Sequence, residues 1–379
     1  MQEPILLTPG PLTTSASVKQ AMLRDWGSRD GDFILLNRRI RDRLVAMAGA
    51  ERTHVCVPLQ GSGTFAIEAT IGTLVPPGGR LLVLVNGAYG RRMVRIAGIA
   101  GRAVRAIEWP EDTPVSPAAL DLALADDPAI THVAVVHCET TSGILNPLDE
   151  IAHVCARQYR PLLVDAMSSF GALPIDAERA SLDAVVASSN KCLEGVPGIG
   201  FALIRREALE AAAGNAHSLS LDLHDQWRGL EANGQWRFTP PTHVLAALDQ
   251  ALDEHQAEGG VAGRGARYRR NHQVLTDGMA ALGFATLVPH HLQAPIIVTF
   301  LMPTETRFVF AEFYDRLREK GFAIYPGKLT MADSFRIGCI GRICAAEIEA
   351  AVAAVGQVMD EMGVVSGAPA RLLAAGEVA

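Results

Sequence analysis

The sequence contains no run of five basic residues, no C-x-x-C pair and no long apolar segment. Its net charge of −7, together with the missing basic patch, argues against nucleic-acid binding. The six cysteines stand singly and form no Cys/His cluster at zinc spacing, so we expect reduced thiols, a cytoplasmic protein and no metal site. The N-terminus lacks the pattern of a signal peptide, and no stretch approaches the roughly eighteen apolar residues of a membrane span.

The residues that are present suit a compact enzyme. The chain has 379 residues, of which 49% are hydrophobic and 20% charged, enough for two domains. Up to residue 204, apolar runs alternate with amphipathic helical patterns, which predicts an α/β domain whose mostly parallel sheet is covered on both faces. We expect strands at residues 55–57, 80–85, 103–107, 132–136, 161–164, 184–187 and 200–204, the last of which could run antiparallel.

A different pattern follows the glycine pair at 259–260. Predicted helices at 264–282, 308–320 and 345–362 alternate with short strands at 296–300, 323–325 and 334–339, which indicates a smaller α+β C-terminal domain. We therefore expect an N-terminal arm (1–13), a large domain (14–258), a small domain (259–365) and a loose tail (366–379). The arm is too rich in proline and glycine for a regular element, yet its apolar residues 5–7 need burial.

Lys191 and Asp165 are the candidate catalytic pair. Each follows a short apolar strand, and Lys191 comes 26 residues after Asp165. That separation is about one strand–crossover–strand unit, so both side chains can emerge at the same edge of the sheet. Such a pair suits pyridoxal phosphate, because the lysine can form a Schiff base while the carboxylate keeps the ring nitrogen protonated. The alternative for this pair alone is an ordinary surface ion pair.

Residues 60–68 form a glycine-rich turn that runs into a predicted helix. The free N–H groups of such a helix, with the hydroxyls of Ser62 and Thr64, would make a phosphate cup. The alternative is a plain turn in which one of these hydroxyls caps the helix. The turn lacks the lysine of a G-x-x-x-x-G-K-[ST] loop, so a nucleoside triphosphate is not expected.

Two further loops are expected at the same edge of the sheet. Residues 86–90 place the Tyr89 ring where it could stack on a flat cofactor, or lie merely at the rim. Residues 137–143 are rich in hydroxyls, and Thr140 could bond a ring hydroxyl of the cofactor. In the same loop His137 could be a core histidine, and Glu139 could brace the loop.

Several motifs together carry a family resemblance. They are Leu-Leu-Thr-Pro-Gly-Pro-Leu-Thr (6–13), Gln-Gly-Ser-Gly (60–63), Asn-Gly-Ala-Tyr-Gly (86–90), Glu-Thr-Thr (139–141), Val-Asp-Ala-Met-Ser-Ser-Phe-Gly (164–171), Asn-Lys-Cys (190–192) and Phe-Arg-Ile-Gly (335–338). From residue 6 to about 362, the chain resembles the fold-type I, class V pyridoxal-phosphate aminotransferases. The arm and the motifs at 218–223, 236–239 and 325–328 are most similar to members that act on a phosphonate.

This resemblance implies transamination of 2-aminoethylphosphonate with pyruvate, giving phosphonoacetaldehyde and L-alanine, by a cytoplasmic homodimer whose active sites lie at the subunit interface. It implies that Lys191 binds the cofactor covalently, that Asp165 pairs with the pyridine nitrogen and that Tyr89 stacks on the ring. The other implied cofactor contacts are Ser62, Gly63, Thr64, Thr140, Asn190 and, from the partner subunit, Thr239. The implied substrate contacts are Arg336, Thr8 and Gly10.

Arg336 has its own chemical argument. Both substrates carry an anionic group, and one guanidinium can hold a phosphonate or a carboxylate in turn with its fork of donors. The alternative is a strand-end arginine in a surface salt bridge.

Three other functions remain open from the sequence. The chain could be another class V aminotransferase, such as an alanine–glyoxylate or serine–glyoxylate enzyme. It could be a lyase of the cysteine-desulfurase or kynureninase type, although Cys339 and Cys344 lie on or just after a predicted strand, whereas a desulfurase needs its catalytic cysteine in a mobile loop. It could also bind a phosphonate or phosphate without catalysis, which would leave the Lys191–Asp165 pair without a role.

Overall fold

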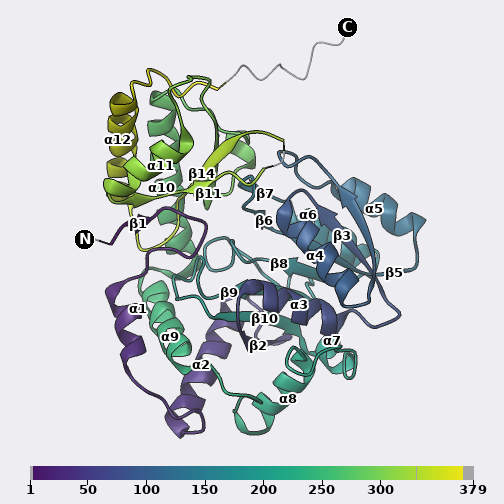
Figure 1. Ribbon diagram of the computed structural model, residues 1–379. Helices are drawn as coiled ribbons and strands as arrows, with labels where there is room; N and C mark the ends of the chain where they lie inside the picture. The colour runs from purple at the N-terminus through teal and green to yellow at the C-terminus, as the bar shows by residue number, and fades with distance from the viewer. Residues whose placement is uncertain (1–2, 330, 370–379) are drawn as a thin grey trace.

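A computed structural model describes residues 3–329 and 331–369, and its core is a seven-stranded sheet with the order β2-β10-β9-β8-β5-β3-β4 (Figure 1). The strands are β2 (His54–Gln60), β3 (Arg80–Val85), β4 (Ala103–Glu108), β5 (Ile130–Val136), β8 (Leu162–Asp165), β9 (Ala184–Ser188) and β10 (Ile199–Arg205). Neighbouring strands from β4 to β9 run parallel, whereas β10 runs antiparallel to both β2 and β9. The expected α/β architecture with one reversed strand is therefore confirmed.

Helices cover both faces of this sheet because alternate residues of each strand point to opposite sides. In β10, Phe201 and Leu203 pack into one core and Ala202 and Ile204 into the other. The first core includes α2 (Gly31–Met47), α5 (Pro117–Asp126), α6 (Leu148–Arg157) and α9 (Thr242–Ala257). The second includes α3 (Gly63–Leu74), α4 (Ala88–Ile99), α7 (Arg206–Ala211) and α8 (Leu223–Asn233).

The C-terminal part has a separate core, seen above the large sheet in Figure 1. Its three-stranded sheet has the order β11-β14-β13, with an aromatic cluster in which Phe335 contacts Phe284, Phe300 and Phe308. The elements are α10 (Gly260–Ala281), η2 (His290–Leu292), β11 (Ile297–Leu301), α11 (Phe310–Glu319), β13 (Tyr325–Pro326), β14 (Ser334–Gly338) and α12 (Ala345–Met362). This is the α+β pattern expected from the sequence.

The N-terminal arm contains a short strand that the sequence did not predict. β1 (Ile5–Leu6) pairs in parallel with β12 (Phe322–Ala323), and the Leu7 N–H donates to the Ala323 carbonyl oxygen at 2.8 Å. Backbone groups of the arm thus find partners in the small domain despite the surrounding prolines and glycine. The arm then leads into α1 (Ala16–Gln20) and η1 (Ala21–Leu23).

The C-terminal segment was expected to be loose from residue 366, but its first residues contact the small domain. The Gly367 N–H donates to the Leu282 carbonyl oxygen at 3.0 Å, and Ala368 accepts from the Thr304 N–H at 3.0 Å. The rest of the predicted tail, 370–379, lies outside the described residues. In the described parts of the chain, no helix is long and apolar enough to cross a membrane.

Candidate active site

A cavity of about 190 Å³ lies at the carboxyl ends of β8 and β9, beside the start of α3. Residues from separate parts of the sequence meet there because parallel strands all end at one edge of the sheet. The predicted site residues that line this cavity are Ser62, Gly63, Thr64, Tyr89, Asp165, Asn190 and Lys191.

Lys191 extends from the turn after β9 toward the N-terminal arm. Its Nζ donates to the carbonyl oxygen of Pro9 at 2.5 Å and lies 3.4 Å from that of Gly10. Gly10 has φ of 104°, and a Cβ built there would lie 2.7 Å from Cδ of Lys191, so only glycine fits this close approach. Burial lowers the pKa of the Lys191 amine, which favours the neutral form needed of a nucleophile or base.

Asp165 is 7% exposed, and its Oδ1 accepts a hydrogen bond from the Met167 N–H at 3.0 Å. Burial raises the pKa of this carboxyl to about 6. Among the described residues, no lysine, arginine or histidine forms an ion pair with it. Asp165 and Lys191 are therefore not a surface ion pair, and the buried carboxylate suits a cationic group of a ligand.

The start of α3 has the features of a phosphate site. Ser62 occupies the N-cap position, but its hydroxyl makes no capping hydrogen bond, so the capped-turn alternative does not hold. A Cβ at Gly63 would clash with the Met167 side chain, which lines the same cavity, so a residue other than glycine here would displace Met167. The hydroxyl oxygen of Thr64 accepts from Nη1 of Arg92 at 3.0 Å, which adds a fixed positive charge to the helix end.

Tyr89 lies in the first turn of α4 rather than in the loop expected from the sequence. The buried Glu139 carboxylate fixes this helix start, since it accepts from the Tyr89 N–H at 3.0 Å and from the Thr141 N–H at 3.0 Å. A carboxylate at a helix N-terminus interacts favourably with the helix dipole. Glu139 is thus the expected brace, and it belongs to an unpredicted hairpin of β6 (Cys138–Glu139) and β7 (Ile144–Leu145).

Arg336 comes from the middle of β14 and connects the small domain to the large one. Its Nη1 donates to the carbonyl oxygen of Thr140 at 2.8 Å, and its Nε donates to that of Pro326 at 3.2 Å. The residue is 5% exposed, and burial lowers the pKa of its guanidinium. A surface salt bridge, the alternative considered for Arg336, is therefore wrong.

Three residues that the sequence analysis singled out, Thr8, Thr239 and His137, do not line this cavity. The Thr8 hydroxyl donates to the Pro11 carbonyl and accepts from the Gly10 N–H at 3.3 Å, so it shapes the arm itself. Thr239 lines a separate exposed cavity with Trp236 and Phe238. His137 contacts the Ser169 hydroxyl at 3.0 Å, and burial lowers its pKa to about 4, as expected of a core histidine. Substrate and cofactor contacts of Thr8 and Thr239 stay predictions.

Two basic residues beside Tyr89 were missed. The guanidinium carbon of Arg92 lies 4.8 Å from the centre of the Tyr89 ring, and Nζ of Lys328 lies 4.7 Å from it. Arg92 follows Tyr89 by three residues, so helical spacing would have placed it on the same face once the helix start was known. Lys328 stands in a motif that was noted only for its resemblance.

Comparison with known proteins gives the family. Residues 15–334 match the family model "Aminotransferase class-V". The chain belongs to this family. A 2-aminoethylphosphonate–pyruvate transaminase of Pseudomonas putida is 56% identical over 95% of this chain and 98% of its own length, and the enzyme of Pseudomonas aeruginosa is 55% identical over 95% and 97%.

Solved structures agree with the fold-type I assignment. An alanine–glyoxylate aminotransferase from Nostoc sp. superimposes with a TM-score of 0.89 at 27% identity, covering 95% of this chain and 96% of the other. A pyridoxamine–pyruvate aminotransferase from Mesorhizobium loti gives 0.86 at 27% identity, covering 97% and 95%. The aminotransferase is pyridoxal-phosphate dependent, as expected. The unpaired buried Asp165, the uncapped start of α3 and the buried Lys191 amine fit that cofactor.

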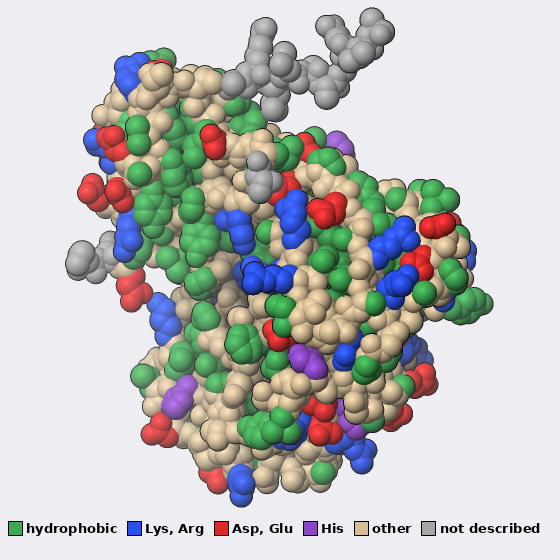
Figure 2. Space-filling view, turned by 45° about the vertical axis from the view of Figure 1, so that its right-hand side comes forward, with side chains coloured by type: hydrophobic (Ala, Val, Ile, Leu, Met, Phe, Trp, Pro, Cys, Tyr) green, Lys and Arg blue, Asp and Glu red, His purple; other side chains and the backbone are tan. Residues whose placement is uncertain are grey.

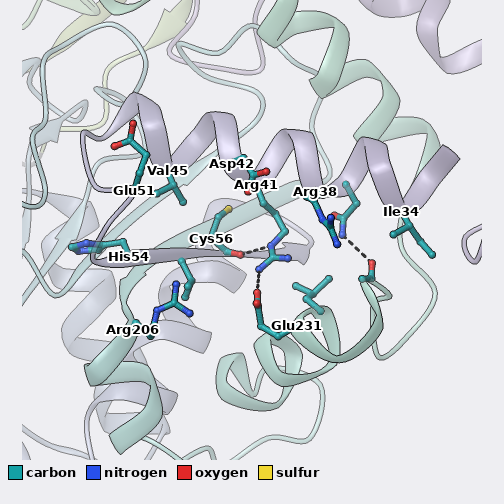
Figure 3. A pocket seen from close by; sticks show the side chains of 14 residues that line it. Ile34, Arg38, Arg41, Asp42, Val45, Glu51, His54, Cys56, Arg206 and Glu231 are labelled. Carbon is teal, nitrogen blue, oxygen red and sulfur yellow. Dashed lines mark hydrogen bonds and ion pairs between the residues drawn. The ribbon is translucent and has the colours of Figure 1, made fainter. Parts of the chain in front are cut away.

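A larger cavity of about 380 Å³ lies between α2, β2 and α8 (Figure 3). Arg41 crosses it, donating from Nε to the Cys56 carbonyl oxygen at 2.9 Å and from Nη2 to Glu231 at 2.6 Å. The Cys56 carbonyl belongs to β2, an edge strand of the sheet, so Arg41 satisfies an acceptor that has no neighbouring strand. None of the predicted site residues lines this cavity.

Proposed function

We propose that this aminotransferase transfers the amino group of 2-aminoethylphosphonate to pyruvate, giving phosphonoacetaldehyde and L-alanine. The observation that carries the proposal is the 55–56% identity, over nearly the whole chain, to relatives named for that reaction. The alternative of an alanine–glyoxylate enzyme has the weaker support of 27% identity. The site is consistent with the proposal, because a buried arginine, Arg336, can bind an anionic substrate group.

We assign the cofactor contacts from the geometry of the cavity. Ser62, Gly63 and Thr64 would bind the phosphate at the start of α3, with Asn190 nearby. Asp165 would pair with the ring nitrogen, and Tyr89 would lie against the ring. When bound, the cofactor withdraws electrons from the substrate carbon next to nitrogen. Thr140 is the proposed partner of the ring hydroxyl.

Lys191 carries the proton transfers in this proposal. Once the substrate amine has displaced it, the Lys191 Nζ can take the proton from the substrate carbon next to nitrogen and return it later. Burial lowers the pKa of this amine, which increases the fraction that can accept a proton at neutral pH. The Pro9 and Gly10 carbonyls orient the side chain, and the arm thereby helps to shield the site from water.

Arg336 is the proposed contact for the anionic end of both substrates. Two of its nitrogens are held by protein carbonyls, which fixes the plane of the guanidinium before the substrate arrives. Nη2 has no hydrogen-bond partner among the described residues, so at least one fork position remains for a phosphonate or carboxylate oxygen. Gly10, which lies against Lys191, is the proposed arm contact on the substrate side.

The quaternary structure, domain division and location are also proposals. We expect a homodimer in which Thr239 reaches the partner's cofactor phosphate, since Thr239 adjoins the exposed Phe238 and lies outside its own cavity. The same proposal divides the chain into arm, large domain and small domain at residues 13, 258 and 365. A cytoplasmic location agrees with six free cysteines, five of them buried. Light scattering of the purified protein would test the dimer.

The reaction itself is tested directly. The purified enzyme, loaded with pyridoxal phosphate, should form equal amounts of L-alanine and phosphonoacetaldehyde from 2-aminoethylphosphonate and pyruvate. Alanine or serine with glyoxylate should react far more slowly. Preferred turnover of an amino acid with glyoxylate would contradict the assignment and favour the alternative aminotransferase.

A further inference from the structure

The anion site has to serve two substrates of different charge. A carboxylate carries one negative charge, whereas a phosphoryl-type group such as a phosphonate carries about 1.5 to 2 at neutral pH. Arg336 supplies a single positive charge, and two of its nitrogens already donate to Thr140 and Pro326. One guanidinium would therefore leave a buried phosphonate with an unbalanced negative charge, which is costly away from water.

A second cation stands in the loop that Arg336 holds. Lys328 follows Pro326 by two residues, and its Nζ lies 4.7 Å from the centre of the Tyr89 ring, which lines the cavity of Lys191 and Asp165. Figure 2 shows Lys and Arg side chains gathered where the small domain meets the large one. Within the described part of the chain, no carboxylate forms an ion pair with Lys328. Among the described residues, its charge therefore has no ion-pair partner.

The guanidinium of the third cation, Arg92, lies at the start of α3. Its Nη1 donates to the Thr64 hydroxyl at 3.0 Å, at the start of α3, where the cofactor phosphate is expected. Arg92 is therefore suited to balance the cofactor's phosphate. Lys328 instead lies in the same loop as Pro326, whose carbonyl oxygen accepts a hydrogen bond from Arg336. This division leaves Arg336 and Lys328 for the substrate.

We propose that Lys328 determines the specificity of the site for a phosphonate. Its ammonium supplies the second positive charge that a phosphonate needs and that the carboxylate of pyruvate does not. With a singly charged substrate, Lys328 stays over the face of Tyr89, where a cation is favourably placed. The inference rests on the proposed function and names the residue that makes one site suit both of its substrates.

The test is Lys328→Met, which keeps an unbranched side chain of similar length without the charge. The kcat/KM of the half-reaction with 2-aminoethylphosphonate should fall about 10- to 100-fold, as expected for one lost charge-assisted hydrogen bond. The half-reaction with pyruvate should change less than about threefold. Lys328→Arg should retain most of the phosphonate activity. The matched control is Lys320→Met, because the Lys320 ammonium pairs with Glu361 at 2.7 Å elsewhere in the small domain and should affect neither substrate.

A binding measurement supplies a second readout. Calorimetry on the cofactor-loaded enzyme should show tighter methylphosphonate binding as the pH rises and the probe loses its second proton. Lys328→Met should remove that increase and leave acetate binding unchanged. Equal losses for both anions would show a general structural role, and an unchanged phosphonate reaction would show that Lys328 only supports Tyr89. A parent enzyme that makes no alanine from 2-aminoethylphosphonate would overturn the proposed function, while the two probe affinities would still decide the role of Lys328.

Discussion

Two buried carboxylates close to Lys191 have opposite surroundings. Glu194 follows Lys191 by three residues, and its N–H donates to the Lys191 carbonyl oxygen at 2.8 Å. Its carboxylate accepts from Nη2 of Arg267 at 2.6 Å and from the Tyr268 hydroxyl at 2.6 Å. Asp165 is also buried, but the one hydrogen bond it accepts from the described residues comes from the Met167 N–H, and burial raises its pKa to about 6.

The network around Glu194 is structural. Glu194 has φ of 60°, a conformation that residues other than glycine seldom adopt, and its ion pairs hold it there. Arg267 also donates to the carbonyl oxygens of Gly341 at 2.6 Å and Ile343 at 2.7 Å. Arg264 donates to the Cys192 carbonyl oxygen at 2.5 Å. These contacts connect the Lys191 turn to α10 and to the small domain.

The comparison distinguishes two uses of a buried acid. Where the chain supplies its own arginines, as at Glu194, the carboxylate stabilises a turn. Where the described residues supply no cation, as at Asp165, we expect a bound group to balance the charge. Substitution of Glu194 or of Asp165 changes one side of this comparison at a time.

The largest effect is expected for Lys191→Ala. Because the proposed role of Lys191 is covalent and then proton transfer, turnover should fall by at least about a thousandfold. The fold should persist, since within the described residues the amine forms hydrogen bonds with no group other than the Pro9 and Gly10 carbonyls. Steady-state alanine formation and circular dichroism would measure the two effects. Residual turnover within about tenfold of the parent enzyme would contradict the assignment.

Glu194→Gln should damage stability rather than chemistry. Arg264 and Arg267 keep Glu258 as an ion-pair partner but lose Glu194, the more deeply buried of their two carboxylates, which should cost up to about 3–5 kcal/mol. Urea unfolding would measure the loss. The matched control is Glu231→Gln, which removes the half-exposed partner of Arg41 and should cost about 1 kcal/mol or less. Equal losses in the two variants would show that the Glu194 network contributes no more to the free energy of unfolding than a surface ion pair does.

Asp165→Asn should reduce the rate of the reaction rather than the stability of the fold. The variant removes the negative charge that is proposed to pair with the cofactor but can still accept the Met167 hydrogen bond through its amide oxygen. Loss of one preorganised charge typically lowers kcat by about 10²–10³-fold. Single-turnover kinetics at full cofactor occupancy would measure this. Near-normal rates would make Asp165 a structural residue like Glu194.

The sheet could be predicted from the sequence because its signals are local. Unbroken apolar strands such as β3 and β5 and the turn residues between elements are visible in the chain itself. The strand β1 could not be predicted, since Ile5 and Leu6 pair with Phe322 and Ala323, more than three hundred residues away. Such pairing depends on tertiary contacts, which a short arm rich in proline does not reveal.

The site residues likewise fall into those that could be predicted from the sequence and those that could not. Lys191, Asp165 and the start of α3 were predictable because parallel strands bring their carboxyl ends together. The orientation of Thr8 and the positions of Arg92 and Lys328 around Tyr89 were not, because they depend on where α4 begins and how the small domain packs. The Glu194 network was missed for the same reason, since its arginines lie on α10, some seventy residues later.

The smallest effect concerns the cofactor-free protein and its pH dependence. Burial raises the pKa of Asp165 from its ordinary 3.8 to about 6 in the folded state. The folded protein therefore holds this proton more tightly than the unfolded chain, and the resulting stability is lost as the pH rises from about 4 to about 6. Above that range, the ionised carboxylate costs the folded state up to about 3 kcal/mol, at ~1.36 kcal/mol per pKa unit.

Asp165→Asn cannot ionise and should escape this cost. Without cofactor, the variant should be as stable as the parent near pH 4 and more stable, by about 1–3 kcal/mol, at pH 7.5. Asp42→Asn, a change at an exposed acid, should show no such trend. Adding pyridoxal phosphate should cancel or reverse the difference, because a bound cation would balance the parent's carboxylate and not the variant's amide. If the parent is the more stable protein at high pH without cofactor, Asp165 already has a partner within the chain, and its contrast with Glu194 does not exist.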